Sequence, residues 1–170
     1  MRIREATNAD TEQVKEIVFT ALTEYGLSHD SSGVDSDLED IEANYIRAGG
    51  TFEVVEDDDG RIIGCVGLHR IGEGVCELRK MYLKREARGK GLGKTLLKRS
   101  IERAGKLGFR RVELETAAPL KEAIALYEQY GFRPIESERI CSRCDQAYAL
   151  DLDESAHTQW AENGEGNRLE

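Results

Sequence analysis

The chain has 170 residues, of which 39% are hydrophobic and 34% are charged, and its formal net charge is −9 at pH 7. This length predicts one domain that can bury a hydrophobic core, and the acidic balance argues against a general nucleic-acid binder. We find neither a signal peptide nor a run of the ~18 apolar residues that cross a membrane, and the four cysteines form no dense framework. We therefore expect a cytoplasmic protein that binds neither membranes nor nucleic acids.

The first half of the chain predicts helices followed by a β-hairpin. Apolar residues at spacings of three and four mark the helices, and β-branched or alternating runs mark the strands. The expected elements are a strand at 3–5, a helix at 14–25, a loop at 26–36, a helix at 38–46, and strands at 52–56 and 61–68. Gly49-Gly50 is expected to end the second helix, and Asp59-Gly60 to form the hairpin turn.

The second half alternates strands and helices. The expected elements are a strand at 75–83, a helix at 92–107, a strand at 111–115, a helix at 120–130, a short strand near 134–135 and a last strand at 148–152. Residues 153–170 are polar and are predicted to form a disordered tail outside a domain at 1–152. The alternation predicts a single mixed α/β domain.

A cluster of basic residues surrounds three closely spaced glycines at 89, 91 and 93. Its members are Arg79, Lys80, Lys84, Arg85, Arg88, Lys90, Lys94, Lys98 and Arg99. The glycines lie at the start of a predicted helix, where unpaired N–H groups bind phosphate and small residues let the phosphate approach the backbone. The cluster therefore predicts a site for a small polyanion, although a solvated basic helix face would give the same pattern.

The stretch RGKGLGKT at 88–95 misses two phosphate-binding motifs by one residue each. Arg88 stands where a nucleoside-triphosphate P-loop needs glycine, and the spacing G-x-G-x-G is one residue short of the dinucleotide fingerprint. Instead, Arg88-x-x-Gly91-x-Gly93 resembles the [RQ]-x-x-G-x-[GA] pyrophosphate signature of the GNAT superfamily of N-acyltransferases. ELRKMYL at 77–83 resembles the family's preceding strand, and A-x-x-L-Y-x-x-x-G-F at 123–132 resembles its closing helix.

The resemblance implies an α/β (α+β) GNAT-like domain, in which helices flank a mixed central sheet with splayed middle strands. It also implies acetyl-CoA as the cosubstrate. The coenzyme-binding residues that it implies are Met81 and Leu83 through their backbone, and Arg88, Gly89, Lys90, Gly91, Leu92, Gly93 and Lys94 in the loop. The Met81 N–H is expected to hold the thioester oxygen as negative charge develops there. The family's frequent Asn near the start of the last helix is missing, because Ala117-Ala118-Pro119 follow Thr116.

Two catalytic roles follow from the same resemblance. Tyr127 matches the tyrosine that protonates the CoA thiolate, and within this motif we favour that role over the alternative, an aromatic side chain that fills the core at helical spacing. Glu77 lies 14 residues before Gly91, which is similar to the spacing of the glutamate base in the histone-acetylating branch. Alternatively, Glu77 is an ion-pair partner of Arg79 or Lys80.

The sequence gives no reason to expect a metal site. Cys141-x-x-Cys144 supplies two ligands, and His29, His69 and His157 show no matching spacing. We interpret Cys141 and Cys144 as ordinary loop cysteines, with a redox pair as the alternative. Cys65 and Cys76 lie in predicted strands and are interpreted as small core residues, so no acyl-cysteine intermediate is expected.

The resemblance places the acceptor pocket at residues 25–40 and 136–146. The acidic residues of the first segment are Asp30, Asp35, Asp37, Glu39 and Asp40. They suit a cationic amine, although a solvated acidic loop is the alternative. We expect direct acetyl transfer to the primary amine of a small molecule, such as an amino acid, a polyamine or an antibiotic-like metabolite. A protein lysine or N-terminal amine, and a non-catalytic acyl-CoA-binding regulator, are the alternatives, and a homodimer is left open.

Overall fold

A computed structural model describes residues 1–138 and 140–152. Its centre is a mixed seven-stranded sheet in the order β1-β2-β3-β4-β5-β7-β6. Neighbouring strands are antiparallel except β4 and β5, which are parallel. The strands are β1 (Arg2–Glu5), β2 (Thr51–Glu56), β3 (Ile62–Gly72), β4 (Val75–Leu83), β5 (Arg111–Thr116), β6 (Arg133–Ile135) and β7 (Gln146–Asp151). The predicted α/β class and splayed mixed sheet are confirmed.

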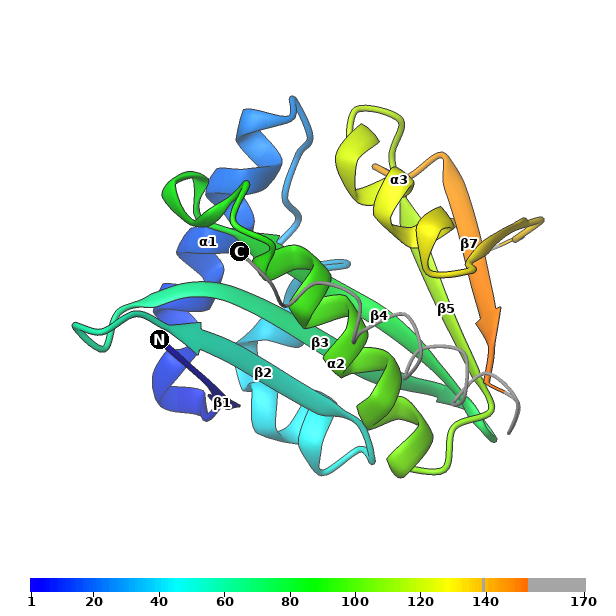
Figure 1. Cartoon of the computed structure of the whole chain (residues 1–170), viewed down its shortest axis with the longest axis horizontal. Coiled ribbons are helices and arrows are strands. Elements are labelled where there is room, and N and C mark those ends of the chain that lie inside the picture. The colour runs from blue at the N-terminus through cyan, green and yellow to red at the C-terminus, as the bar shows by residue number, and fades with distance from the viewer. Residues whose placement is uncertain (139, 153–170) are drawn as a thin grey trace, which may run out of the picture.

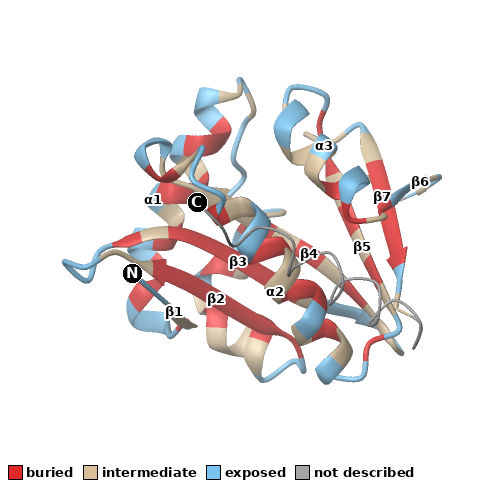
Figure 2. Cartoon of the chain, in the orientation of Figure 1, coloured by how far each residue is buried: buried red, intermediate tan, exposed pale blue. Residues whose placement is uncertain are grey.

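Helices cover both faces of the sheet. The α-helices are α1 (Thr11–Glu24), α2 (Leu92–Lys106) and α3 (Lys121–Gln129). Figure 1 shows α2 and α3 on the near face and α1 on the far face. Two clusters of buried side chains fill the space between the helices and the sheet, one under α2 and α3 and the other under α1 and the 38–45 segment. In Figure 2 the central strands are accordingly buried along most of their length.

The second predicted helix is not an α-helix. A 3-10 helix, η2 (Ser36–Asp40), is followed by a π-helix, η3 (Glu42–Ile46). The Arg47 N–H donates to the Glu42 carbonyl and the Gly50 N–H to the Tyr45 carbonyl, which are the five-residue spacings of a wider turn. Apolar spacing predicted a helix correctly but could not distinguish its type, because Leu38, Ile41 and Tyr45 are fully buried in this arrangement too.

The remaining elements match the sequence prediction closely. β3 runs to Gly72, four residues beyond the predicted end, and turns into β4 through Glu73-Gly74, where Gly74 has a φ of 70°. A second short 3-10 helix, η1 (Asn8–Asp10), precedes α1, and a third, η4 (Arg85–Ala87), follows β4. None of the described helices is long and apolar enough to cross a membrane. The predicted tail at 153–170 lies outside the described residues.

Candidate active site

The centre of the sheet opens between β4 and β5. These two strands pair only at the start of β4, where Val75, Cys76 and Glu77 lie opposite Arg111, Val112 and Glu113. From residue 78 onward, β4 pairs with β3 alone. The second half of β4 therefore has one edge that no strand covers.

A β-bulge in β4 lies where the two strands part. Gly67 pairs with Arg79 and Cys65 with Tyr82, so β4 has one residue more than β3 between these pairs. Lys80 lies within the bulge and has a φ of 55°, in the left-handed region that non-glycine residues seldom adopt. The bulge also shifts the alternation of side chains. Met81 and Leu83 consequently pack into the same cluster as Cys76 and Leu78.

Backbone groups of Met81 and Leu83 face the open edge. The Lys84 N–H donates to the Ile63 carbonyl on β3, at 2.8 Å. Because successive residues of a strand direct their N–H and C=O groups to opposite sides, those of Leu83 and Met81 point away from β3. The Leu83 carbonyl accepts a hydrogen bond from the Arg88 Nε at 3.0 Å. The Met81 N–H and the Leu83 N–H are thus oriented toward the space between β4 and β5.

The glycine loop ends at the first turn of α2. Gly91 precedes the helix with a φ of 79°, and the first helical hydrogen bond runs from the Thr95 N–H to the Gly91 carbonyl at 3.0 Å. The N–H groups of Leu92, Gly93 and Lys94 therefore have no carbonyl acceptor within the helix and are free to bind an anion. A Cβ at Gly93 would lie 3.8 Å from Leu126 on α3 and 4.0 Å from Leu83 on β4. The loop, the open end of β4 and α3 thus meet at one place.

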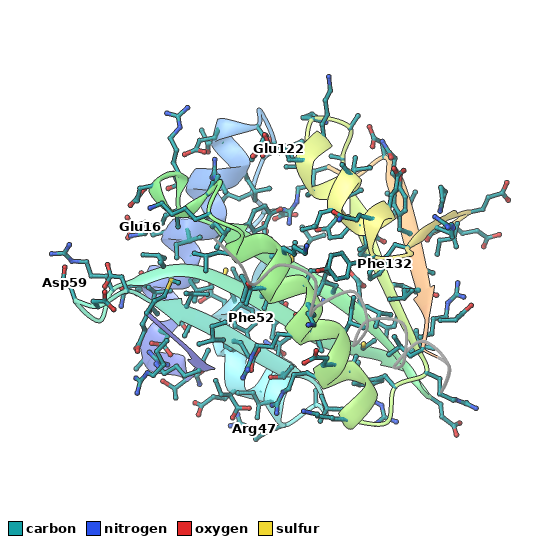
Figure 3. The ribbon with its side chains drawn as sticks, in the orientation of Figure 1. Glu16, Arg47, Phe52, Asp59, Glu122 and Phe132 are labelled. Atoms are coloured by element: carbon teal, nitrogen blue, oxygen red, sulfur yellow. The ribbon has the colours of Figure 1, made fainter. Side chains whose placement is uncertain are left out.

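Tyr127 follows Leu126 on α3 and is 7% exposed. Burial raises the pKa of its hydroxyl far above the ordinary value, and the nearby Tyr82 raises that pKa further. The Tyr127 ring also packs at 5.8 Å from the Phe132 ring, and Phe132 is labelled beside α3 in Figure 3. A phenol in such surroundings stays protonated at neutral pH, so its hydroxyl can donate a hydrogen bond, while the raised pKa makes it a weaker acid than an exposed tyrosine.

Comparison with known proteins identifies the family. The model of the acetyltransferase (GNAT) family matches residues 16–132. A curated relative in Escherichia coli (strain K12), named "Uncharacterized N-acetyltransferase YjgM", is 37% identical over 145 residues, which are 82% of this chain and 86% of the relative. The chain belongs to the GNAT family.

Two further similarities concern the acceptor and the coenzyme of other GNAT proteins. The N-acetylaspartate synthetase of Danio rerio is 36% identical over 110 residues, 64% of this chain and 39% of that protein. The solved structure of yncA from Salmonella typhimurium with its cofactor acetyl-CoA has a TM-score of 0.69 and 25% identity, and the match covers 91% of this chain and 95% of that one. The GNAT fold, and with it an acyltransferase enzyme, is thus established for this chain.

Glu77, the predicted base of this GNAT enzyme, is bound to a cation. Its two carboxylate oxygens accept hydrogen bonds from the Arg79 Nε and Nη2 at 2.9 and 3.0 Å. The Arg79 Nη1 also lies 3.5 Å from Asp37, whose Oδ2 accepts a hydrogen bond from the Tyr45 hydroxyl. The ion pair with Arg79 is the alternative that the sequence left open. It leaves each Glu77 oxygen only its second lone pair for a proton or a water molecule.

The basic cluster divides into paired and unpaired cations. Arg79, Lys80, Arg88 and Arg99 all have carboxylate partners. Arg88 binds Glu24 on α1 and lies over the Tyr25 ring at 5.6 Å, so in this structure it ties the loop to α1. Within the described part of the chain, no ion pair is formed by Lys84, Arg85, Lys90, Lys94 or Lys98. These five residues are the available positive charge near the loop.

A pocket of about 190 Å³ lies between α1 and the loop that follows β4. Its wall includes Glu16, Thr20 and Glu24 from α1, and Lys84 and Arg85 from the loop. Glu16 is labelled on α1 in Figure 3, next to that loop. The pocket thus lies beside the glycine loop, and its wall contains both acidic groups of α1 and unpaired cations of the basic cluster.

Asp35, in the acidic 30–40 segment, is not free to attract a cationic acceptor. Asp35 is fully buried and binds the Arg143 guanidinium through both oxygens, at 2.7 and 2.9 Å. It also accepts hydrogen bonds from the Lys80 ammonium and from the Asp30 N–H. Burial alone would raise the pKa of Asp35, but Arg143 and Lys80 outweigh it and hold the pKa well below the ordinary value.

Three other acids of this segment also have partners, whereas the exposed Asp30 accepts hydrogen bonds from Ser32 and Gly33 within its own turn. Asp37 lies 3.4 Å from Lys80, and Glu39 binds Lys15 at 2.6 Å. Asp40 accepts a hydrogen bond from the Asn8 side chain at 2.9 Å. The prediction of an acidic attraction surface was therefore wrong for Asp35 and Asp37, since residues distant in the sequence neutralise both.

Proposed function

We propose that this GNAT enzyme transfers an acetyl group from acetyl-CoA directly to the primary amine of a small molecule. The observation that carries the proposal is the uncovered edge of β4, where the Met81 and Leu83 N–H groups lie beside the N-terminus of α2. A thioester supplies an activated acetyl group when acetyl-CoA is bound. The loop from Arg88 through Gly89, Lys90, Gly91, Leu92 and Gly93 to Lys94 would hold its pyrophosphate, with backbone N–H groups and unpaired lysines as the donors.

The residues of the open edge have distinct roles in this proposal. The Met81 N–H stabilises the negative charge that develops on the carbonyl oxygen during attack by the amine. Tyr127 gives a proton to, or hydrogen-bonds with, the departing thiolate; its hydroxyl is protonated and can donate there, although its raised pKa weakens it as an acid. Glu77 takes the proton of the attacking amine directly or through water, and Arg79 keeps the carboxylate in place.

Direct transfer is favoured over an acyl-cysteine intermediate. Cys65 and Cys76 are buried, and burial raises the pKa of each thiol to about 12. Such groups stay protonated at neutral pH and are weak nucleophiles. Neither buried thiol suits an acyl-cysteine intermediate, and in the proposal the acceptor amine attacks the thioester itself.

An amino acid is the acceptor class that we propose first. A relative with 36% identity is named N-acetylaspartate synthetase, so one GNAT protein of similar sequence has a name that states an amino-acid acceptor. Around the predicted acceptor pocket of this chain, the cations are balanced by carboxylates: Lys80, Arg79 and Arg143 pair with Asp35, Asp37 and Glu77. These paired groups leave no excess of positive or negative charge that would favour a strongly charged polymer as the acceptor. A protein lysine or N-terminal amine stays the second candidate.

The proposal is tested by measuring thiol release from acetyl-CoA with a panel of amines. The panel contains aspartate and other amino acids, polyamines, aminoglycosides, and peptides with a free lysine or N-terminal amine. We expect thiol release above the hydrolysis rate with at least one small amine. Release with peptides alone would select the second candidate, and binding of acetyl-CoA without release for any amine would indicate a regulator.

Coenzyme binding is tested separately by thermal unfolding. Acetyl-CoA at about one hundred times its Kd should stabilise the fold by about 2.7 kcal/mol through ligand linkage. An unchanged melting temperature with millimolar CoA, together with a rise on addition of ATP and Mg²⁺, would contradict the coenzyme site.

A further inference from the structure

Three side chains with metal-binding atoms meet where β5 joins the segment before β7. Glu115 lies on β5, and Cys141 and Cys144 lie in a turn 26 to 29 residues further on. One carboxylate oxygen and the two sulfur atoms all lie within 4.8 Å of one another. All three residues are partly exposed, so an ion could reach them from solvent. In Figure 1 this region is at the upper ends of β5 and β7.

Backbone hydrogen bonds fix the positions of these three groups. The Cys141 N–H donates to Glu115 Oε2 at 2.9 Å, and the Cys144 N–H donates to the Cys141 carbonyl at 2.9 Å, which closes the turn. The Asp145 N–H binds the Thr116 carbonyl at 3.0 Å, so the turn is also tied to β5 directly after Glu115. The three potential ligands therefore do not depend on a freely moving loop.

We propose that Cys141, Cys144 and Glu115 bind a Zn²⁺ ion. Two thiolates and one carboxylate form a donor set that suits zinc, whereas calcium and magnesium require oxygen ligands throughout. The spacing Cys-x-x-Cys is common in zinc sites, and Glu115 supplies the third ligand that the sequence spacing did not reveal. Three protein ligands leave the fourth tetrahedral position to water or to another small ligand. Binding releases the thiol protons to solvent and oxidises no atom.

The proposed ion would stabilise the side of the site opposite the glycine loop. Arg143 lies between the two cysteines in the sequence, and its guanidinium binds the buried Asp35. Asp35 in turn binds Lys80 in the β4 bulge. An ion that holds the 141–144 turn therefore also limits the movement of Arg143, and through Asp35 it supports the bulge that opens β4 from β5.

The test is a metal titration of the full chain after reduction and removal of metal. Co²⁺ serves as the spectroscopic probe, because thiolate ligation gives charge-transfer absorption and tetrahedral geometry gives strong visible bands. We expect one Co²⁺ per chain with both signals, and we expect Zn²⁺ to displace it and to raise the melting temperature. Cys141→Ser and Cys144→Ser should each weaken binding by about 100-fold or more, since even changes outside the ligand shell cost about 10–100-fold.

Matched variants separate ligation from general surface effects. Glu115→Gln should weaken Co²⁺ binding, whereas Glu113→Gln, two residues earlier on the same strand and paired with Arg111 instead, should not. Ser142→Ala, between the two cysteines, should bind like the parent. The proposal fails if the reduced chain gives no thiolate–cobalt absorption, if the chain takes up no metal and only forms a 141–144 disulfide, or if the two cysteine variants bind Co²⁺ as tightly as the parent.

Discussion

The glycine loop and the Asp35 cluster (Asp35, Lys80 and Arg143) use positive charge in opposite ways. Near the loop, Lys90 and Lys94 have no carboxylate partner among the described residues, and helix N–H groups next to them lack acceptors. In the Asp35 cluster, two cations bind one buried aspartate, and Lys80 also lies 3.4 Å from Asp37. A charge left unpaired in a folded chain is available to a ligand, whereas a buried and paired charge serves the fold. The same residue types therefore indicate coenzyme binding in one region and architecture in the other.

Asp35→Asn should have the largest effect, and this effect should be a loss of folding stability. The change leaves Lys80 and Arg143 without their shared counter-charge in a buried place, and breaking a buried ion pair costs about 3–5 kcal/mol. Urea unfolding of the variant and the parent measures the loss. A loss below about 1 kcal/mol would contradict the distinction between the two regions, because it would mean that the cluster is no more essential than surface charge.

The same cluster predicts a pH dependence. Because the folded-state pKa of Asp35 is lowered, its contribution to stability is complete above the unfolded pKa of about 3.9 and is lost as the pH falls through the lower folded pKa. The free energy of unfolding of the parent should therefore fall below about pH 4 more steeply than that of Asp35→Asn. Parallel acid-unfolding curves would show that Asp35 carries no such linkage.

Tyr127→Phe should reduce turnover with little change in fold or coenzyme affinity. The ring and its packing against Phe132 remain, and only the hydroxyl is lost. General acids contribute about 10²–10⁴-fold in rate, and the loss should lie at or below this range because a thiolate with a pKa near 8.5 leaves readily. Steady-state kinetics should place the loss in kcat. Full turnover in Tyr127→Phe, with instability appearing only in Tyr127→Ala, would assign the residue to packing alone.

Gly91→Val tests the loop against a matched glycine at the other end of α2. Gly91 and Gly108 have φ values of 79° and 85°, and a Cβ at either position would meet no atom within 4 Å. Both valine variants should lose about 1–2 kcal/mol of stability from left-handed strain. In Gly91→Val alone we expect CoA affinity to fall as well, by about 10–100-fold, because the charge-assisted contacts to phosphate are hindered. Equal affinities in the two variants would remove this loop from the coenzyme site.

Lys90→Ala and Lys94→Ala should have the smallest effects, and these should depend on salt. Each lysine is an exposed charge near a helix N-terminus, so each should contribute about 0.3–1 kcal/mol to binding of a phosphate at low ionic strength. Calorimetric titration with CoA at low and high salt measures this contribution. Lys106→Ala at the opposite end of α2 is the control and should leave the affinity unchanged. A salt-independent loss in the Lys90 and Lys94 variants would argue against a purely electrostatic contact.

Much of the fold was predictable because the signals are local. The predicted strand at 75–83 agrees with β4 at both ends, and the helix over 92–107 is one residue longer than α2. Leu97, Ile101 and Ala104 lie on one face of α2 as their spacing requires, and all three are buried. The 38–46 helix was predicted in place but not in type, since apolar spacing does not report which carbonyl each N–H reaches.

The candidate site was only partly predictable. Glycines at 89, 91 and 93 predict a phosphate-binding loop to within a few residues. The structure places the first two directly before α2 and the third in the first turn of that helix. The bulge at Lys80 gives no comparable signal, because it replaces strict alternation with a conformation that lysine seldom adopts. One clue was present in the sequence: Lys80 follows Cys76 and Leu78 in the buried phase of the strand, and a lysine there needs a counter-charge.

The sequence by itself determined the order of elements, the resemblance to the GNAT family and the position of the glycine loop, because each rests on periodicity or on spacing within about one element. Only the tertiary structure decided which charges are paired. Lys80 meets Asp35 across 45 positions, and Arg143 meets it across 108. Glu115 lies 26 residues before Cys141, on a different element. Such contacts depend on how distant segments pack together, and that packing leaves no repeating pattern in a single sequence.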